Sequence, residues 1–134
     1  MQIPANAHVA VLDGERFLLL RNEGTATDPR LALEAEPEVA ETNKDAGKRD
    51  HESSHRRGGE PHDRAAHAAG VADWLNRAVL QRRIDSLVIV ADPDSLGELR
   101  RHLHVTTQAA VVGELDKQLT GMPGPDILKI LEAA

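Results

Sequence analysis

Three aspartates stand at points of the sequence where acidic side chains commonly do chemistry. Asp13 follows the apolar run 8–12. Asp92 and Asp94 follow the apolar run 87–91. One hypothesis is that all three form a ribonuclease H-like carboxylate cluster that holds magnesium, in a metal-dependent nuclease or hydrolase using Asp13 and Asp92. Asp92 is expected at the carboxyl end of a central strand, where open α/β sheets bind ligands. Aspartate is also favoured in hairpin turns and at helix caps, and we prefer these structural roles for all three residues.

Histidines are the other potential metal ligands. His51 and His55 are four residues apart, a spacing that aligns two ligands only on a helix. The residues around them include almost no apolar side chain, so they provide no ordered scaffold for a metal ion. We therefore expect neither a native metal site nor a cofactor. The weaker metal candidates are His51, His55, Asp13 and Asp92.

The segment 41–60 carries the residues best suited to bind an anion. Residues 44–64 hold six Lys or Arg and five Asp or Glu, a net of +1 in a chain whose formal net charge is −6. The segment is too poor in apolar side chains to offset its ordering entropy, so it is expected to be a long mobile loop. The candidate binding residues for RNA or another anionic ligand are Arg49, Arg56, Arg57, Gly58, Gly59 and Glu60.

The composition of the chain limits its fold and its partners. Its 134 residues suit one domain spanning 1–134. The absence of cysteine excludes disulfides and thiolate metal sites. Phe17 and Trp74 are the only aromatic residues, which argues against base stacking on single-stranded nucleic acid, and the negative net charge opposes DNA binding. The lack of a long apolar run or leader predicts a cytoplasmic protein with no membrane partner.

The apolar patterns predict the order β-β-β-loop-α-β-α-β-α. An Asp-Gly pair joins strands expected at 8–12 and 16–21. Pro37 either places a third strand, expected at 31–39, at an edge of the sheet or bends it there. The later elements are expected to be a helix from Pro61, a buried strand at 87–91, a helix from Asp92, a strand at 107–112 and a helix at 126–131. This order describes a single α/β domain with a mixed five-stranded sheet and helices on its faces. Gly97 is expected to mark close packing of the second helix on that sheet.

Three stretches resemble one family. Val11–Phe17 is similar to the opening hairpin of the bacterial host attachment proteins (proteins required for attachment to host cells). Leu87–Arg100 resembles their strand, acidic-proline turn and helix, and Gly113–Thr120 resembles their closing segment. The resemblance implies a fold akin to the central domain of archaeal and eukaryotic peptide-chain release factors, itself related to the ribonuclease H-like arrangement.

In those release factors a Gly-Gly-Gln loop between the third strand and the first helix enters the peptidyl-transferase centre of the ribosome. The corresponding stretch here is Arg56 to Glu60, with Glu60 where the glutamine would stand. An ionised carboxylate only accepts hydrogen bonds, whereas an amide also donates, so the resemblance does not extend to peptide release.

The leading hypothesis is a non-enzymatic protein that binds the ribosome or ribosomal RNA in translation through the 41–60 loop. The alternatives are a metal-dependent nuclease or hydrolase using Asp13 and Asp92, an indirect role in bacterial attachment to host cells, and a homo-oligomer. Self-association would use the edge strand around Pro37 or an Ala-rich helix face.

Overall fold

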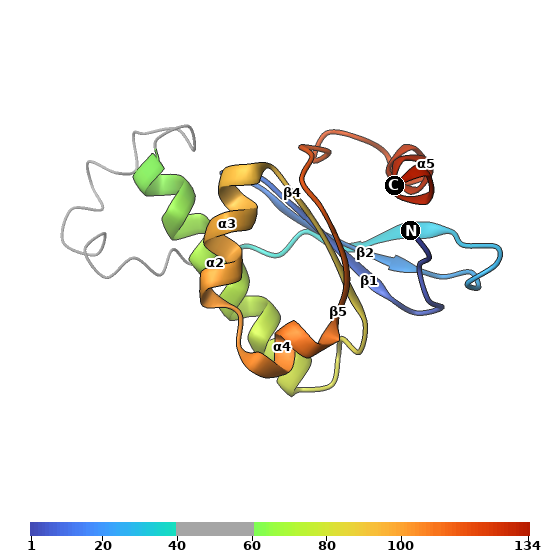
Figure 1. Cartoon of the computed structure of the whole chain (residues 1–134), viewed down its shortest axis with the longest axis horizontal. Helices are drawn as coiled ribbons and strands as arrows, with labels where there is room; N and C mark the ends of the chain where they lie inside the picture. The colour runs from blue at the N-terminus through green and yellow to red at the C-terminus, as the bar shows by residue number, and fades with distance from the viewer. Residues whose placement is uncertain (40–60) are drawn as a thin grey trace.

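The computed structural model describes residues 1–39 and 61–134 and contains one five-stranded sheet with the order β3-β2-β1-β4-β5 (Figure 1). The strands are β1 His8–Leu12, β2 Phe17–Asn22, β3 Leu31–Ala35, β4 Leu87–Ala91 and β5 Val111–Leu115. The helices are α2 Pro61–Leu80, α3 Pro93–His102, α4 Val105–Ala110 and α5 Gly124–Ala133. The predicted α/β fold with a mixed five-stranded sheet is confirmed.

The first half of the sheet is antiparallel and the second half is parallel. β1 pairs with β2, and β2 with β3, in antiparallel fashion. β1 pairs with β4, and β4 with β5, in parallel fashion. The prediction that the third strand lies at an edge is confirmed, and this strand ends at Ala35, before Pro37. Because β1 and β4 lie inside the sheet, every residue of both strands is buried.

The two faces of the sheet have separate cores because successive side chains of a strand point to opposite sides. Ala10 and Leu12 of β1 face α2 and α3, where they join a cluster that includes Leu75 and Leu99. Val9 and Val11 face α5 and pack in the second cluster with Ile127. In Figure 1, α2, α3 and α4 lie on one side of the sheet and α5 lies on the other.

The predicted strand at 107–112 is wrong in its first part. Residues 105–110 form the short helix α4, and β5 begins only at Val111. The buried side chain of Asn76 on α2 explains the difference, because its Oδ1 accepts hydrogen bonds from the His104 backbone nitrogen (2.9 Å) and the Thr107 hydroxyl (2.7 Å). These contacts hold the start of α4 against α2, so tertiary structure overrides the β preference of the Val-Thr-Thr sequence.

Other expectations can be compared directly with the structure. The two aromatic residues meet, since the Trp74 ring of α2 contacts that of Phe17 in β2 edge-on at a centroid distance of 5.3 Å. The expectation for Gly97 is wrong, because a Cβ atom at that position would find no atom within 4 Å. The loop expected at 41–60 lies outside the described residues. Within the described residues, no helix is long and apolar enough to cross a membrane.

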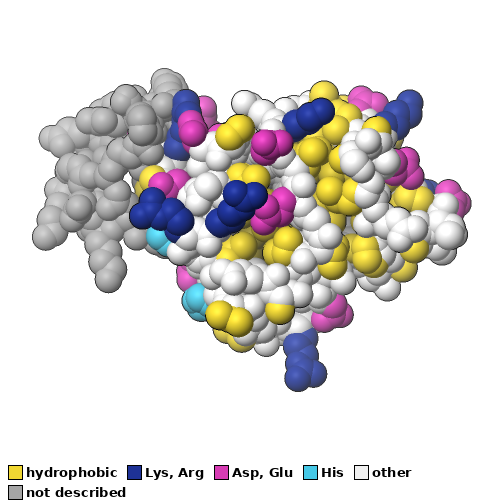
Figure 2. Space-filling model, in the orientation of Figure 1, with side chains coloured by type: hydrophobic (Ala, Val, Ile, Leu, Met, Phe, Trp, Pro, Cys, Tyr) yellow, Lys and Arg dark blue, Asp and Glu magenta, His cyan; other side chains and the backbone are white. Residues whose placement is uncertain are grey.

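Figure 2 shows how side-chain types are distributed on one face of the molecule. Hydrophobic side chains gather over α5 and the segment that leads into it, whereas basic and acidic side chains lie next to one another over α3. The two sides of the sheet are therefore covered by helices of different surface character.

Candidate functional site

The carboxyl ends of β1 and β4 bring Asp13 and Asp92 close together. Leu12 is the register partner of Ala91, so the next residue of each strand lies at the same level in neighbouring parallel strands, which are about 5 Å apart. A polar cleft of about 340 Å³ opens here. Its lining residues are Asp13, Gly14, Glu15, Arg64, Asp92, Pro93, Asp94 and Gln118. The structure thus brings together the three aspartates that the sequence raised, as its less favoured alternative, as a carboxylate cluster.

Asp13 is held by hydrogen bonds to both of its carboxylate oxygens. Its Oδ1 accepts from the backbone nitrogens of Glu15 and Arg16, each at 2.8 Å, which closes the β1–β2 hairpin turn. Its Oδ2 accepts from the Thr120 hydroxyl at 2.6 Å. Burial alone would raise the pKa of Asp13, but these hydrogen bonds and the nearby His67 together lower it. The carboxylate is thus ionised and fixed in its orientation.

Asp92 caps α3, which decides between Asp92 and Asp94, the two caps that the sequence left open. Its Oδ2 accepts a hydrogen bond from the Ser95 backbone nitrogen at 3.1 Å, and Pro93 occupies the first turn of the helix. Its Oδ1 is buried without a hydrogen-bond partner. Asp94, in the first turn of α3, forms an ion pair with Arg64 of α2 at 3.3 Å. The acidic turn therefore joins the amino-terminal ends of the two helices.

The metal hypothesis receives no support from this geometry. Within the described parts of the chain, no three His, Asp or Glu side chains lie together in a way that could hold a metal ion. Both oxygens of Asp13 already accept hydrogen bonds, so a bound cation would compete with them. His51 and His55 lie outside the described residues. Asp13 and Asp92 have the structural roles that the sequence favoured, and the metal-dependent hydrolase stays a prediction.

The segment 40–60 is attached at the same edge of the sheet. β3 and β1 are both antiparallel to β2, so the carboxyl end of β3 lies at the edge that carries Asp13. Residues 36–39 continue beside the hairpin turn and α2, where they line a cleft of about 540 Å³ with Arg16 and His67. Val39 packs against the core, and α2 resumes the described chain at Pro61.

This end of the molecule, formed by the residues that follow β1, β3 and β4 and by the first turns of α2 and α3, is called the carboxyl edge below. The predicted binding residues Arg49, Arg56, Arg57, Gly58, Gly59 and Glu60 belong to the segment attached there, but they lie outside the described residues.

The structure adds residues to this edge that the sequence did not indicate. Thr120 is 107 residues from Asp13 in the chain, and no local sequence pattern predicts the hydrogen bond between them. Arg16 forms an ion pair with Glu36 at 3.0 Å, which fixes the chain leaving β3 against the hairpin. His67 places its Nδ1 2.9 Å from the carbonyl oxygen of Asp13. These contacts attach the β1–β2 hairpin turn to Thr120, to the chain after β3 and to α2.

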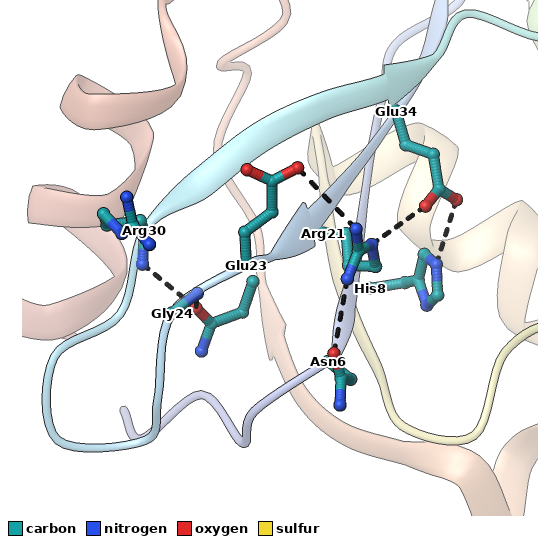
Figure 3. Close-up of polar contacts among 8 residues, drawn as sticks. Asn6, His8, Arg21, Glu23, Gly24, Arg30 and Glu34 are labelled. Carbon is teal, nitrogen blue, oxygen red and sulfur yellow. Dashed lines mark hydrogen bonds and ion pairs between the residues drawn. The ribbon is translucent and has the colours of Figure 1, made fainter.

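A second polar group links β1, β2 and β3 near the amino end of β1 (Figure 3). Glu34 lies 3.0 Å from Nε2 of the buried His8, and it accepts a hydrogen bond from Arg21 at 3.1 Å. Arg21 also donates to Asn6 and lies 3.6 Å from Glu23. Because His8, Arg21 and Glu34 come from three neighbouring strands, we assign the group to the stability of the sheet.

Comparison with known proteins identifies one family. Residues 6–131 match the family model described as "Bacterial archaeo-eukaryotic release factor family 12". This match supports the release-factor part of the resemblance seen in the sequence, and the host attachment part stays a prediction. No curated protein matches the chain.

Proposed function

Because the chain belongs to bacterial archaeo-eukaryotic release factor family 12, we propose that it is a non-enzymatic protein that binds the ribosome or ribosomal RNA. The family match over residues 6–131 is the observation that carries this proposal. The contact would be made by the segment between β3 and α2, which occupies the place of the Gly-Gly-Gln loop in the release factors that the sequence resembles.

The distribution of charge supports the choice of this segment. The described lining of the cleft at the carboxyl edge includes three aspartates and one glutamate but only one arginine. Such a surface repels phosphate groups, so contacts with RNA must come from elsewhere. Residues 44–64 have a net charge of +1, which leaves −7 for the rest of a chain of net charge −6. Arg49, Arg56 and Arg57 are the side chains that we expect to pair with phosphates.

The base of the segment suits this role because it is fixed on both sides. The chain leaves β3 through the Arg16–Glu36 ion pair at 3.0 Å and the packed side chain of Val39. It returns to α2, whose first turns are tied to α3 by Arg64 and Asp94 and to the hairpin by His67. The two described ends of the segment therefore lie at one edge of the sheet, and we expect a partner to bind at this edge.

Glu60 distinguishes this proposal from peptide release. The glutamine of the resembled loop can donate and accept hydrogen bonds, whereas the carboxylate of Glu60 only accepts them. We therefore propose binding to the ribosome without hydrolysis of peptidyl-tRNA. Such a protein would act in the cytoplasm, and any role in attachment to host cells would be indirect.

The experiment is co-sedimentation of the purified chain with purified ribosomes at several salt concentrations. We expect the unsubstituted chain to sediment with ribosomes, and Arg56→Ala/Arg57→Ala to bind at least about tenfold more weakly, because each lost guanidinium–phosphate pair contributes about 1.5–3 kcal/mol. Arg101→Ala/Lys129→Ala is the matched control, since it removes two exposed basic side chains from α3 and α5.

The salt dependence provides a second readout. If Arg56 and Arg57 each contact a phosphate, their removal lowers the slope of log affinity against log salt by roughly 2. The proposal is wrong if the chain stays in the ribosome-free fractions of lysates from both growing and starved cells. It is also wrong if the two double variants bind equally well.

A further inference from the structure

The connection between α2 and β4 carries two adjacent, exposed arginines, Arg82 and Arg83. It lies at the amino ends of β1 and β4, opposite the carboxyl edge (Figure 1). Neither guanidinium forms an ion pair with a described residue. The other described arginines, apart from Arg30, are paired with carboxylates of their own chain. Two positive charges therefore remain uncompensated side by side at this end of the molecule.

Arg82 occupies a backbone position that favours glycine. Its φ of 61° lies in the left-handed region. The Arg82 nitrogen donates to the carbonyl oxygen of Val79 at 3.0 Å, and the Arg83 nitrogen donates to that of Ala78 at 2.9 Å, the pair of hydrogen bonds with which many helices end on a glycine. Strained residues of this kind cluster at functional sites. The exposed side chain of Arg82 is therefore a candidate for a contact outside the chain.

Arg83 is held with its guanidinium in a defined orientation. Its Cζ lies over the Trp74 ring, 5.2 Å from the ring centroid, and its Nε donates to Oε1 of Gln81 at 3.0 Å. Its two terminal nitrogens have no hydrogen-bond partner among the described residues. A guanidinium fixed in this way loses little side-chain entropy when its fork binds an anion.

We propose that Arg82 and Arg83 bind backbone phosphates of RNA, as a second contact of this chain. A guanidinium fork matches two phosphate oxygens, which gives both geometry and charge for this ligand. Asp85 is the only acidic residue between Trp74 and β4, so the two arginines outnumber the carboxylates of the connection. Because Phe17 and Arg83 already contact the Trp74 ring, the site recognises phosphates rather than stacked bases. The choice of RNA among phosphate-bearing partners rests on the proposed function.

Fluorescence anisotropy of a fluorescein-labelled oligouridylate, titrated with the purified chain at several salt concentrations, tests this site. We expect Arg82→Gly to weaken binding at least about threefold and to lower the slope of log affinity against log salt by about 0.7, the value for one phosphate of a single strand. The same variant should raise the Tm by about 2–4 °C, because glycine relieves the left-handed backbone. A purely structural role of Arg82 would change the Tm alone. Arg101→Ala is the matched control, since it removes an exposed arginine that is paired with Glu98, and it should leave the affinity unchanged.

Trp74 provides a second readout because it is the only tryptophan of the chain. Its emission should change as the oligouridylate saturates the site, over the same concentration range as the anisotropy. Arg83→Ala should abolish this change in emission and weaken binding, while circular dichroism shows the native fold.

Both titrations are repeated with Arg56→Ala/Arg57→Ala, so that this site and the segment between β3 and α2 can fail separately. The proposal is overturned if the unsubstituted chain does not bind the oligouridylate at low salt, or if Arg82→Gly and Arg83→Ala bind it as tightly as Arg101→Ala does. It is also overturned if the Trp74 emission stays constant while the anisotropy rises. Failure to sediment with ribosomes, with oligouridylate binding retained at this site, would overturn the proposed function alone.

Discussion

Replacing Asn22 with alanine should destabilise the fold more than any single surface change, because this fully buried amide ties together three separate segments. The two hydrogens of its Nδ2 are shared among the carbonyl oxygens of Ile3 and Pro4, each at 3.1 Å, and of Thr25 at 3.2 Å. Its Oδ1 accepts from the backbone nitrogens of Gly24 at 2.9 Å and Arg30 at 3.0 Å. The side chain thus fastens both the amino-terminal segment and the β2–β3 connection to the end of β2.

The expected loss of stability follows from these five contacts. A net hydrogen bond contributes about 1 kcal/mol, and a buried group left without a partner costs about 1–3 kcal/mol. The contact with Ile3 is fully buried, whereas the other four are partly buried, so water can replace part of what they lose. The free energy of unfolding should therefore fall by roughly 3–5 kcal/mol, a large part of the stability of a small domain.

Urea unfolding followed by circular dichroism measures this change. With an m value of about 1.5–2 kcal/mol/M, the midpoint should fall by roughly 2 M. Asn22→Asp is the matched control for volume. It keeps the acceptor but places a carboxylate next to three carbonyl oxygens, so it should be about as unstable as the alanine variant. Gln2→Ala removes an exposed amide and should change the free energy by less than about 0.5 kcal/mol.

Hydrogen exchange gives a local readout of the same contacts. The amides of Gly24 and Arg30 donate to Asn22, so both should exchange faster in Asn22→Ala. A fall of less than about 1 kcal/mol in the free energy of unfolding, with unchanged exchange at these amides, would refute the reasoning.

Three other changes should have measurable effects on stability. Thr120→Val removes a hydrogen bond that lowers the pKa of Asp13 below its ordinary value of 3.8. A pKa that is lowered in the folded state stabilises the fold above pH about 4, and this stabilisation is lost as the pH falls through the folded-state pKa. The variant should therefore unfold at a higher pH in an acid titration, and an unchanged pH midpoint of unfolding would contradict this. Gly24→Ala should lower the free energy of unfolding by about 2 kcal/mol or more, because its Cβ would lie 2.2 Å from the carbonyl oxygen of Asp28. Gly97→Ala should raise it by about 0.5–1 kcal/mol, since this helical position has open space around it; thermal unfolding of the two glycine variants checks both signs.

Local patterns in the sequence were sufficient for most of the fold. The Asp13-Gly14 pair predicted the hairpin because glycine readily takes the positive φ of tight turns between strands. The hairpin is confirmed, but no described glycine has a positive φ, and the turn is closed by Asp13, which accepts hydrogen bonds from the backbone two and three residues later. The continuous apolar run 87–91 indicated an interior strand, and all five of its residues are buried. Asp92 indicated the start of α3 because capping depends only on nearby backbone groups. In each case the stabilising contact lies within a few residues.

Long-range contacts explain where the sequence was insufficient. Thr107 lies in α4 rather than in a strand because Asn76, 31 residues earlier, accepts its hydroxyl hydrogen bond. The packing expected around Gly97 depends on the tilt of α3, which no periodicity reveals. The link between Thr120 and Asp13, which fixes the carboxyl edge, joins positions 107 residues apart.

The sequence by itself determined most of the elements and their order, with the short helix α4 at residues 105–110 as the exception. Hydrophobic period, turn chemistry and capping act over a few residues, and each can be recognised in a single chain. Only the tertiary structure decided that Asp13 is held in place by Thr120 and that Leu33 faces an open groove beside α5. Those features depend on which distant segments pack together, and a pattern along one chain does not specify them.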